Sequence, residues 1–103
     1  MDTAISRNGV PIRLTDERWD HITRRHMEMG DLRDQVMETL AAPEQVQQGD
    51  FGELLAIRPY TDTPLGPKHL VAVYREVSPE DGFVLTAYLT RRPSRTRVIL
   101  WKR

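Results

Sequence analysis

The chain has 103 residues, no cysteine, and fifteen acidic and fifteen basic side chains, so its formal net charge is zero. A chain of this length is expected to fold as one domain with its own hydrophobic core. The lack of cysteine excludes disulfides, zinc–thiolate sites and a thiol nucleophile. No apolar run approaches the ~18 residues of a membrane-spanning helix. We therefore expect a cytoplasmic protein with no membrane partner.

The charges are unevenly distributed along the chain. Residues 1–52 carry six arginines against ten acidic side chains, whereas residues 53–103 carry nine basic side chains against five acidic ones. The last thirteen residues hold six cations and no acidic side chain. A basic end on a neutral domain indicates a polyanionic partner. The alternative is a strand edge whose charges prevent it from pairing with other chains.

Two helices are predicted in the first half of the chain. Thr15 is a suitable N-cap, and a helix is expected to follow it to about residue 29. Three side chains on its inward face have the spacing of one helical stripe: Trp19, Ile22 and His26. A second helix is expected from Asp31 until Pro43 ends it. Its apolar stripe consists of Leu32, Val36 and Leu40.

Strands are expected mainly after the helices. The clearest signal is a hairpin over residues 68–92, because two apolar runs flank the turn sequence SPEDG. Weaker strand signals lie at residues 45–48, 53–58 and 95–102, and a flexible tail (1–9) precedes a short edge strand (10–14). This order predicts an α+β fold with two N-terminal helices packed on one face of an antiparallel sheet of about four strands. Residues 10–103 would form this single domain.

Alternation assigns the side chains of the hairpin to two faces. In its second strand, one face is apolar and is expected to belong to the core: Phe83, Leu85, Ala87 and Leu89. The other face carries Val84 and a row of polar groups: Thr86, Tyr88, Thr90 and Arg92. The first strand is apolar on both faces, which predicts a central strand covered on both sides. Tyr74 on that strand is expected either beside Tyr88 or packed away.

His26 is the candidate acid–base group. A histidine at the rim between helix and sheet, near hydroxyl and guanidinium groups, suits RNA cleavage through the neighbouring 2′-hydroxyl. That reaction needs a group that exchanges protons near neutral pH and cations around the phosphate, and the substrate supplies the nucleophile. His21 lies five positions before His26, which is not an i, i+4 ligand pair, so we expect no metal site. The alternative for His26 is a hydrogen-bonded histidine favoured by the helix dipole.

Further residues around the polar row are candidates for contact with a substrate. Arg58 closes an apolar strand and would lie at the rim of the sheet, and Arg91 and Arg92 end the hairpin. Each candidate has a plainer alternative. Tyr74 and Tyr88 would be sheet tyrosines with their hydroxyl groups at the surface, and the paired arginines would be an exposed strand end.

Several stretches of the chain together resemble a known family. LTDERWDHITRRH, LAAPEQV, HLVAVYREV, FVLTAYLTRR and VILWKR occur in this order over about residues 12–103. This pattern resembles the phage-associated nuclease domains of the barnase–EndoU–colicin–RelE-like (BECR) group and, more distantly, BrnT-type toxins. The resemblance implies a RelE/barnase-like fold and metal-independent ribonuclease chemistry without a cofactor.

The resemblance also implies roles for individual residues. The Arg25-His26 pair and the TAYLTRR stretch carry the likeness, with His26 as the acid–base group and Arg25 beside it at the substrate. Arg58 and Arg91 would contact the scissile phosphate. Thr86 and Tyr88 would complete the catalytic site on the sheet, and Tyr74 and Arg92 would help to bind the substrate.

The leading hypothesis is therefore a toxin-like or phage-linked endoribonuclease that acts on RNA, with an antitoxin or immunity protein as a partner. One alternative is a non-catalytic module of the same fold whose basic face docks RNA or an acidic protein. Another is a structural domain of a phage particle or of a larger polymorphic protein, in which the charges only keep the domain in solution.

Overall fold

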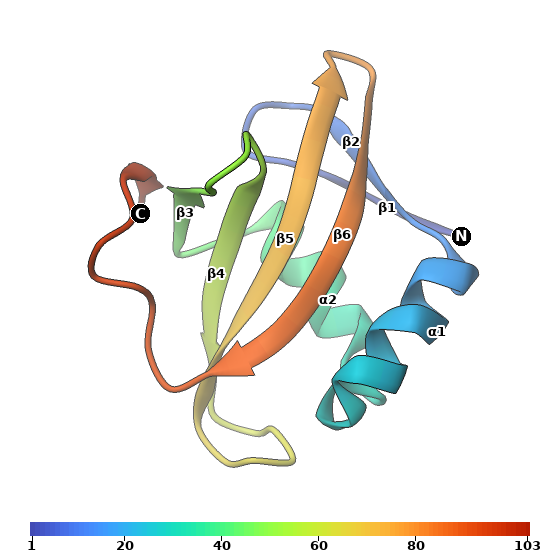
Figure 1. Cartoon of the computed structure of the whole chain (residues 1–103), viewed down its shortest axis with the longest axis vertical. Coiled ribbons are helices and arrows are strands. Elements are labelled where there is room, and N and C mark those ends of the chain that lie inside the picture. Colours follow the sequence, from blue (N-terminus) through green and yellow to red (C-terminus); the bar gives the residue numbers. More distant parts are fainter.

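The computed structural model describes residues 1–103 and contains two α-helices, one 3₁₀-helix and seven strands (Figure 1). The elements in chain order are β1 (Asp2–Ile5), β2 (Pro11–Leu14), α1 (Asp16–Arg25), η1 (Met27–Met29), α2 (Arg33–Ala41), β3 (Gln45–Gln48), β4 (Leu54–Tyr60), β5 (Lys68–Ser78), β6 (Asp81–Thr90) and β7 (Ile99–Lys102). The longest helix has ten residues, and no helix is long and apolar enough to cross a membrane.

All seven strands form one mixed sheet in the order β1-β2-β6-β5-β4-β3-β7. Neighbouring strands are antiparallel except for β2 and β6, which are parallel and pair Ile12 with Gly82. The expectation of an antiparallel sheet of about four strands is therefore wrong. The sheet is larger because β1 and β2 extend it beyond the hairpin on one side and β7 extends it on the other.

The N-terminal residues belong to the sheet. Residues 2–5, expected in a flexible tail, form β1 and pair with β2 along its whole length. β2 consequently lies between two strands and is not the edge strand that Pro11 suggested. Arg33 holds this corner together, because its guanidinium group lies 2.8 Å from both Asp2 Oδ2 and Asp16 Oδ1.

Apolar side chains are buried on both faces of the sheet, and the helices cover one of them. Figure 1 shows α2 crossing behind β5 and β6, and α1 beside β6. The larger core lies between the helices and the sheet, and it includes the predicted stripe of α2: Leu32, Val36 and Leu40. A smaller apolar cluster lies on the opposite face: Leu55, Ile57, Val71 and Val73. The prediction that β5 is a central strand buried from both sides is confirmed.

The ends of α1 decide where His26 lies. Thr15 is the N-cap, as predicted, and its Oγ1 accepts a hydrogen bond from the backbone N–H of Arg18 at 3.1 Å. The helix ends at Arg25, four residues earlier than expected. His26 then leaves helical geometry (φ −129°, ψ 78°), while its backbone N–H still donates to the Ile22 carbonyl at 2.8 Å. The chain turns here, and the imidazole is carried toward the sheet.

A β-bulge in β6 changes the predicted faces of the hairpin. Val73 lies opposite Thr86 but Tyr74 lies opposite Val84, so Leu85 is an extra residue in β6. An extra residue of this kind shifts the alternation on one side of the bulge. Val84 therefore joins the larger core, whereas Leu85 packs on the opposite face. Beyond the bulge, Ala87 lies in the larger core as expected.

Candidate functional site

The sheet face opposite α2, here called the open face, contains a groove of about 300 Å³. Its floor is apolar and consists of Leu55, Ile57 and Val71. Polar side chains of β3, β6 and the segment that joins β6 to β7 surround this floor: Gln47, Tyr88, Thr90, Arg92, Ser94 and Arg97. The groove thus combines an apolar base with hydroxyl, amide and guanidinium groups.

His26 does not line this groove but contacts Tyr88, which does. Their ring centroids are 5.9 Å apart and the ring planes are inclined by 38°. This contact is possible because β2 pairs with β6 only at Gly82 and Phe83, so the far half of β6 has a free edge that the end of α1 approaches. The His26 side chain is 33% exposed, and its Nδ1 lies 3.6 Å from Glu28 Oε1. The imidazole therefore contacts both Tyr88 and solvent.

The Tyr88 phenol is kept in its neutral form. Burial raises its pKa above the ordinary value, and the positive charge of Arg97 opposes that rise. Burial disfavours the charged form of a phenol because a phenolate loses hydration in the apolar surroundings. At neutral pH the hydroxyl of Tyr88 is consequently a hydrogen-bond donor next to the histidine.

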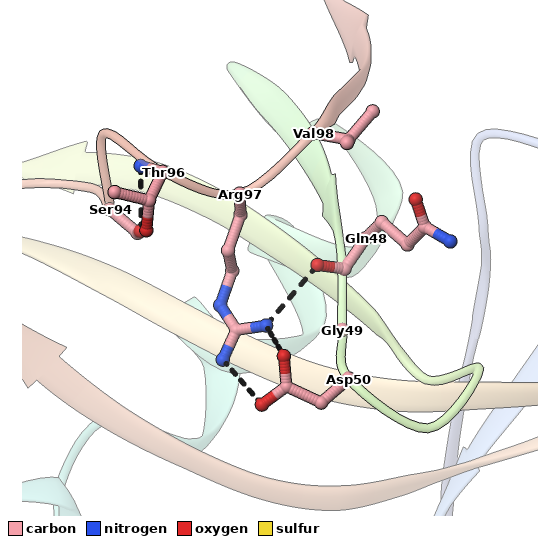
Figure 2. Close-up of a pocket in the computed structure, with 7 residues that line it drawn as sticks. All are labelled: Gln48, Gly49, Asp50, Ser94, Thr96, Arg97 and Val98. Carbon is pink, nitrogen blue, oxygen red and sulfur yellow. Dashed lines mark hydrogen bonds and ion pairs between the residues drawn. The ribbon is translucent and has the colours of Figure 1, made fainter.

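Residues 91–98, here called the 91–98 segment, connect β6 to β7 and form one wall of the groove. Arg97 anchors it to the turn after β3, because its guanidinium group lies 3.0 Å from Asp50 Oδ1 and donates to the Gln48 carbonyl at 3.3 Å (Figure 2). Figure 2 also shows Ser94 beside Thr96, with their hydroxyl oxygens 3.2 Å apart. These contacts border a second hollow of about 450 Å³. Arg97 lines both hollows.

The structure brings several of the predicted site residues together on the open face. Thr86 lies opposite Val73, and Thr90 lies opposite His69, so both have the same orientation as Tyr88. Arg92 follows them, is exposed and lines the groove without an ion-pair partner. Thr86, Tyr88 and Thr90 therefore share a face, as the alternation in the hairpin predicted, and His26 contacts Tyr88.

Two other predicted arginines lie near the groove but do not line it. Arg25 is exposed at the end of α1, next to His26 in sequence. Arg91 is exposed and lines a separate hollow with Tyr60 and His69, and its carbonyl oxygen is 3.3 Å from His69 Nδ1.

Arg58 and Tyr74 lie on the helix side of the sheet, away from His26 and Tyr88. Arg58 pairs with Leu70 in the register, donates to the Ala42 carbonyl at 2.7 Å and lies 3.6 Å from Glu38 Oε1. Tyr74 is 1% exposed in the larger core, where burial raises its pKa. Neither side chain can contact a ligand in the groove, so of the two predicted environments for Tyr74 the structure has the packed one.

The sequence did not single out Gln47, Ser94 and Arg97 as site residues. Gln47 is buried on the open face opposite Leu55 and donates from Nε2 to the Ser94 carbonyl at 3.0 Å. The available signal was the pair of glutamines at alternate positions of β3, Gln45 and Gln47, since both would face the same side of a strand. Arg97 was visible only as one of six cations near the C-terminus.

The arrangement offers proton exchange and anion binding. His26 can take up or release a proton, the phenol of Tyr88 can donate a hydrogen bond, and two guanidinium groups border the groove. No group of three or more His, Asp or Glu side chains is arranged to hold a metal ion. No family model, curated protein or solved structure matches the chain.

Proposed function

We propose that the chain is a metal-independent endoribonuclease, toxin-like or phage-linked, that cleaves RNA by attack of a 2′-hydroxyl on the adjacent phosphodiester. One observation carries the proposal: the His26 ring lies 5.9 Å from the ring of Tyr88, and Tyr88 lines a groove that Arg92 and Arg97 border. A proton acceptor, a neutral hydroxyl donor and cations are the groups that this reaction requires.

In the proposed reaction, His26 removes the proton from the 2′-hydroxyl as the 2′-oxygen bonds to phosphorus. The bond between phosphorus and the 5′-oxygen breaks, and the leaving oxygen takes a proton from solvent at the exposed rim. The products are a 2′,3′-cyclic phosphate and a 5′-hydroxyl end. The Tyr88 phenol donates a hydrogen bond to a phosphate oxygen, and the guanidinium group of Arg92 stabilises the charge that develops there.

The remaining candidates extend the substrate path. The hydroxyls of Thr86 and Thr90 lie along β6 next to Tyr88 and would contact the ribose or phosphate of the bound strand. Arg25 and Arg91 are exposed on either side of this row and would bind neighbouring phosphates. The proposal implies a cytoplasmic protein whose activity an antitoxin or immunity protein restrains, with acidic side chains that meet these arginines.

A second candidate function is a non-catalytic module that binds RNA or an acidic protein. It is favoured by the exposed cations Arg91, Arg92 and Arg95, none of which forms an ion pair within the chain. Arginines without an ion-pair partner can bind phosphates even if His26 has no catalytic role. Such binding would weaken steeply as the salt concentration rises, because counterions compete for the phosphates.

The deciding experiment incubates the purified protein with total RNA in the presence of a chelator and analyses the ends of the products. We expect fragments with 2′,3′-cyclic phosphate ends. The Tyr88→Phe variant, purified in the same way, should cleave more slowly and thereby controls for contaminating nucleases. Salt-dependent RNA binding without products would favour the binding module. The absence of both RNA cleavage and RNA binding would contradict both candidate functions.

A further inference from the structure

One polar atom of the buried Gln47 side chain has no hydrogen-bond partner. Its side chain is 1% exposed and lines the groove from β3. Nε2 donates to Gln45 Oε1 at 3.1 Å and to the Ser94 carbonyl at 3.0 Å, but Oε1 has no hydrogen-bond partner. Since a backbone carbonyl can only accept, the amide nitrogen must face Ser94, and the oxygen is the atom left over. A buried acceptor without a donor is costly, so a missing N–H or O–H partner is implied.

The surroundings of Gln47 indicate what kind of partner fits. The side chain lies opposite Leu55, so the amide adjoins the apolar floor of the groove. The groove volume of about 300 Å³ lies at the small end of the range for ligand pockets. An apolar floor, the aromatic side of Tyr88 and one unpaired acceptor suit a flat heterocycle that carries an N–H donor. Arg92 and Arg97 at the border suit a phosphate attached to it.

The 91–98 segment beside this pocket is held by one exposed ion pair and a few hydrogen bonds. Oε1 is covered in the unbound chain, so neighbouring side chains or backbone have to move before a base can reach it. The 91–98 segment adjoins the same amide, because the Ser94 carbonyl accepts from Nε2 at 3.0 Å. One anchor of that segment is the Arg97–Asp50 pair, whose side chains are 30% and 70% exposed. Hydrogen bonds from Gln47 Nε2 to the Ser94 carbonyl and from the Gln48 N–H to the Val98 carbonyl also hold it. Ion pairs with such exposure contribute little to stability, and a bound phosphate can replace Asp50 as the partner of the guanidinium group.

We infer that the groove contains a base-binding subsite in which Gln47 Oε1 accepts a hydrogen bond from the exocyclic amine of a nucleobase. The base packs on Leu55, Ile57 and Val71 beside Tyr88, and its phosphate meets Arg92. This inference rests on the proposed function, because the base would bind in the same groove as the RNA. It adds to that function a preference for nucleobases that carry an exocyclic amine. Cytosine and adenine present an amine where uracil and hypoxanthine present a carbonyl oxygen, which would oppose the glutamine oxygen.

The test is binding of single nucleotides, because they have no phosphodiester to cleave. CMP and UMP are a matched pair that differ by an amine and a carbonyl at one ring position, and AMP and IMP form a second pair. We expect CMP and AMP to bind about tenfold more tightly than UMP and IMP, which corresponds to one well-placed hydrogen bond. NMR signals of the Gln47 amide and of the Leu55, Ile57 and Val71 methyl groups should shift on binding.

A pair of variants separates the role of the oxygen from general effects. Gln47→Met has nearly the same shape without the acceptor and should bind CMP and UMP equally. Gln48→Met, at the neighbouring exposed position, should keep the preference. If Gln47→Met does not fold, the comparison of CMP with UMP on the natural chain still decides, together with the shifted signals.

The outcomes distinguish this inference from the proposed nuclease. Equal affinities for CMP and UMP, no nucleotide binding, or shifts confined to the helix side of the sheet would overturn the base subsite even if the protein cleaves RNA. A preference for CMP in a protein that does not cleave RNA would uphold the subsite and remove the nuclease proposal.

Discussion

Replacement of His26 by alanine is the sharpest test of its proposed catalytic role. The change removes the imidazole but keeps the backbone N–H that donates to Ile22 at the end of α1. We expect RNA cleavage to fall ~100- to 10,000-fold, the usual contribution of a positioned acid–base group. The ring is 33% exposed and its aromatic contact is with Tyr88. Loss of one such contact costs about 0.5–1.5 kcal/mol.

That loss of stability is small enough to separate from catalysis. For a domain of this size, 1 kcal/mol lowers Tm by about 4–8 °C, so the variant should stay folded at assay temperature. Cleavage is measured on a fluorogenic RNA with chelator present, and Tm by circular dichroism. His21→Ala is the matched control, because His21 is an exposed histidine of the same helix and should change neither quantity. Undiminished cleavage by His26→Ala would refute the catalytic role. A collapse of Tm would show that the histidine is structural.

Three further predictions concern the groove, the helix and pH. Arg92→Ala should weaken RNA binding and lower the slope of log Kd against log salt by about 0.7, as expected for one phosphate contact on a single strand. Arg24→Ala is the control and should leave the slope unchanged, because Arg24 pairs with Asp20. Equal slopes in both variants would exclude the phosphate contact of Arg92. Thr15→Ala should lower the free energy of unfolding by about 1 kcal/mol in urea titrations, while Thr23→Ala, at an exposed hydroxyl bound to Asp20, should stay within ~0.5 kcal/mol. Burial raises the pKa of Tyr60 from 10.0 to about 12, so its stabilisation is complete below pH 10 and is lost as the pH rises toward 12. Tyr60→Phe should make that alkaline fall smaller but not abolish it, because burial also raises the pKa values of Tyr74 and Tyr88. An unchanged fall would assign it to these other groups.

The sequence predicts the elements whose signal is local. The hairpin of β5 and β6 follows from two apolar runs around a turn, and the start of α1 follows from the capping hydroxyl of Thr15. The buried stripe of α2 follows from the spacing of Leu32, Val36 and Leu40. Each of these signals depends only on neighbours in the chain, so each could be predicted before the tertiary structure was known.

What the sequence does not predict depends on distant pairing. β1 has four residues of mixed exposure, and it becomes a strand only because β2 lies beside it. No turn joins β2 to β6, so no local sequence signal predicts their parallel pairing. The bulge at Leu85 follows from the register against β5, and it exchanges the faces of Val84 and Leu85 without a glycine to mark the position.

The candidate site likewise contains residues that the sequence predicts and residues that it does not. Tyr88 and Thr90 share a face because alternation holds beyond the bulge. His26 contacts Tyr88 because the chain leaves helical geometry at the end of α1. Arg58 was expected at the substrate because it ends a strand at the rim. In the structure Arg58 lies opposite Leu70 of β5 and therefore points to the helix side. This orientation cannot be known before the pairing of β4 with β5 is known. Gln47 was missed because a buried glutamine is recognised only when its surroundings are known.

The most direct test of the central claim maps the RNA-binding surface on the protein. A short RNA with 2′-O-methyl ribose throughout has no free 2′-hydroxyl and cannot be cleaved by 2′-hydroxyl attack. It can be titrated into isotope-labelled protein while backbone NMR signals are followed. We predict shifts along the open face, at Tyr88, Thr90 and Arg92 and in the 91–98 segment. Signals of α2 should stay in place. Shifts centred on α2, or no shifts in the presence of excess ligand at low salt, would contradict the claim that the open face binds the substrate.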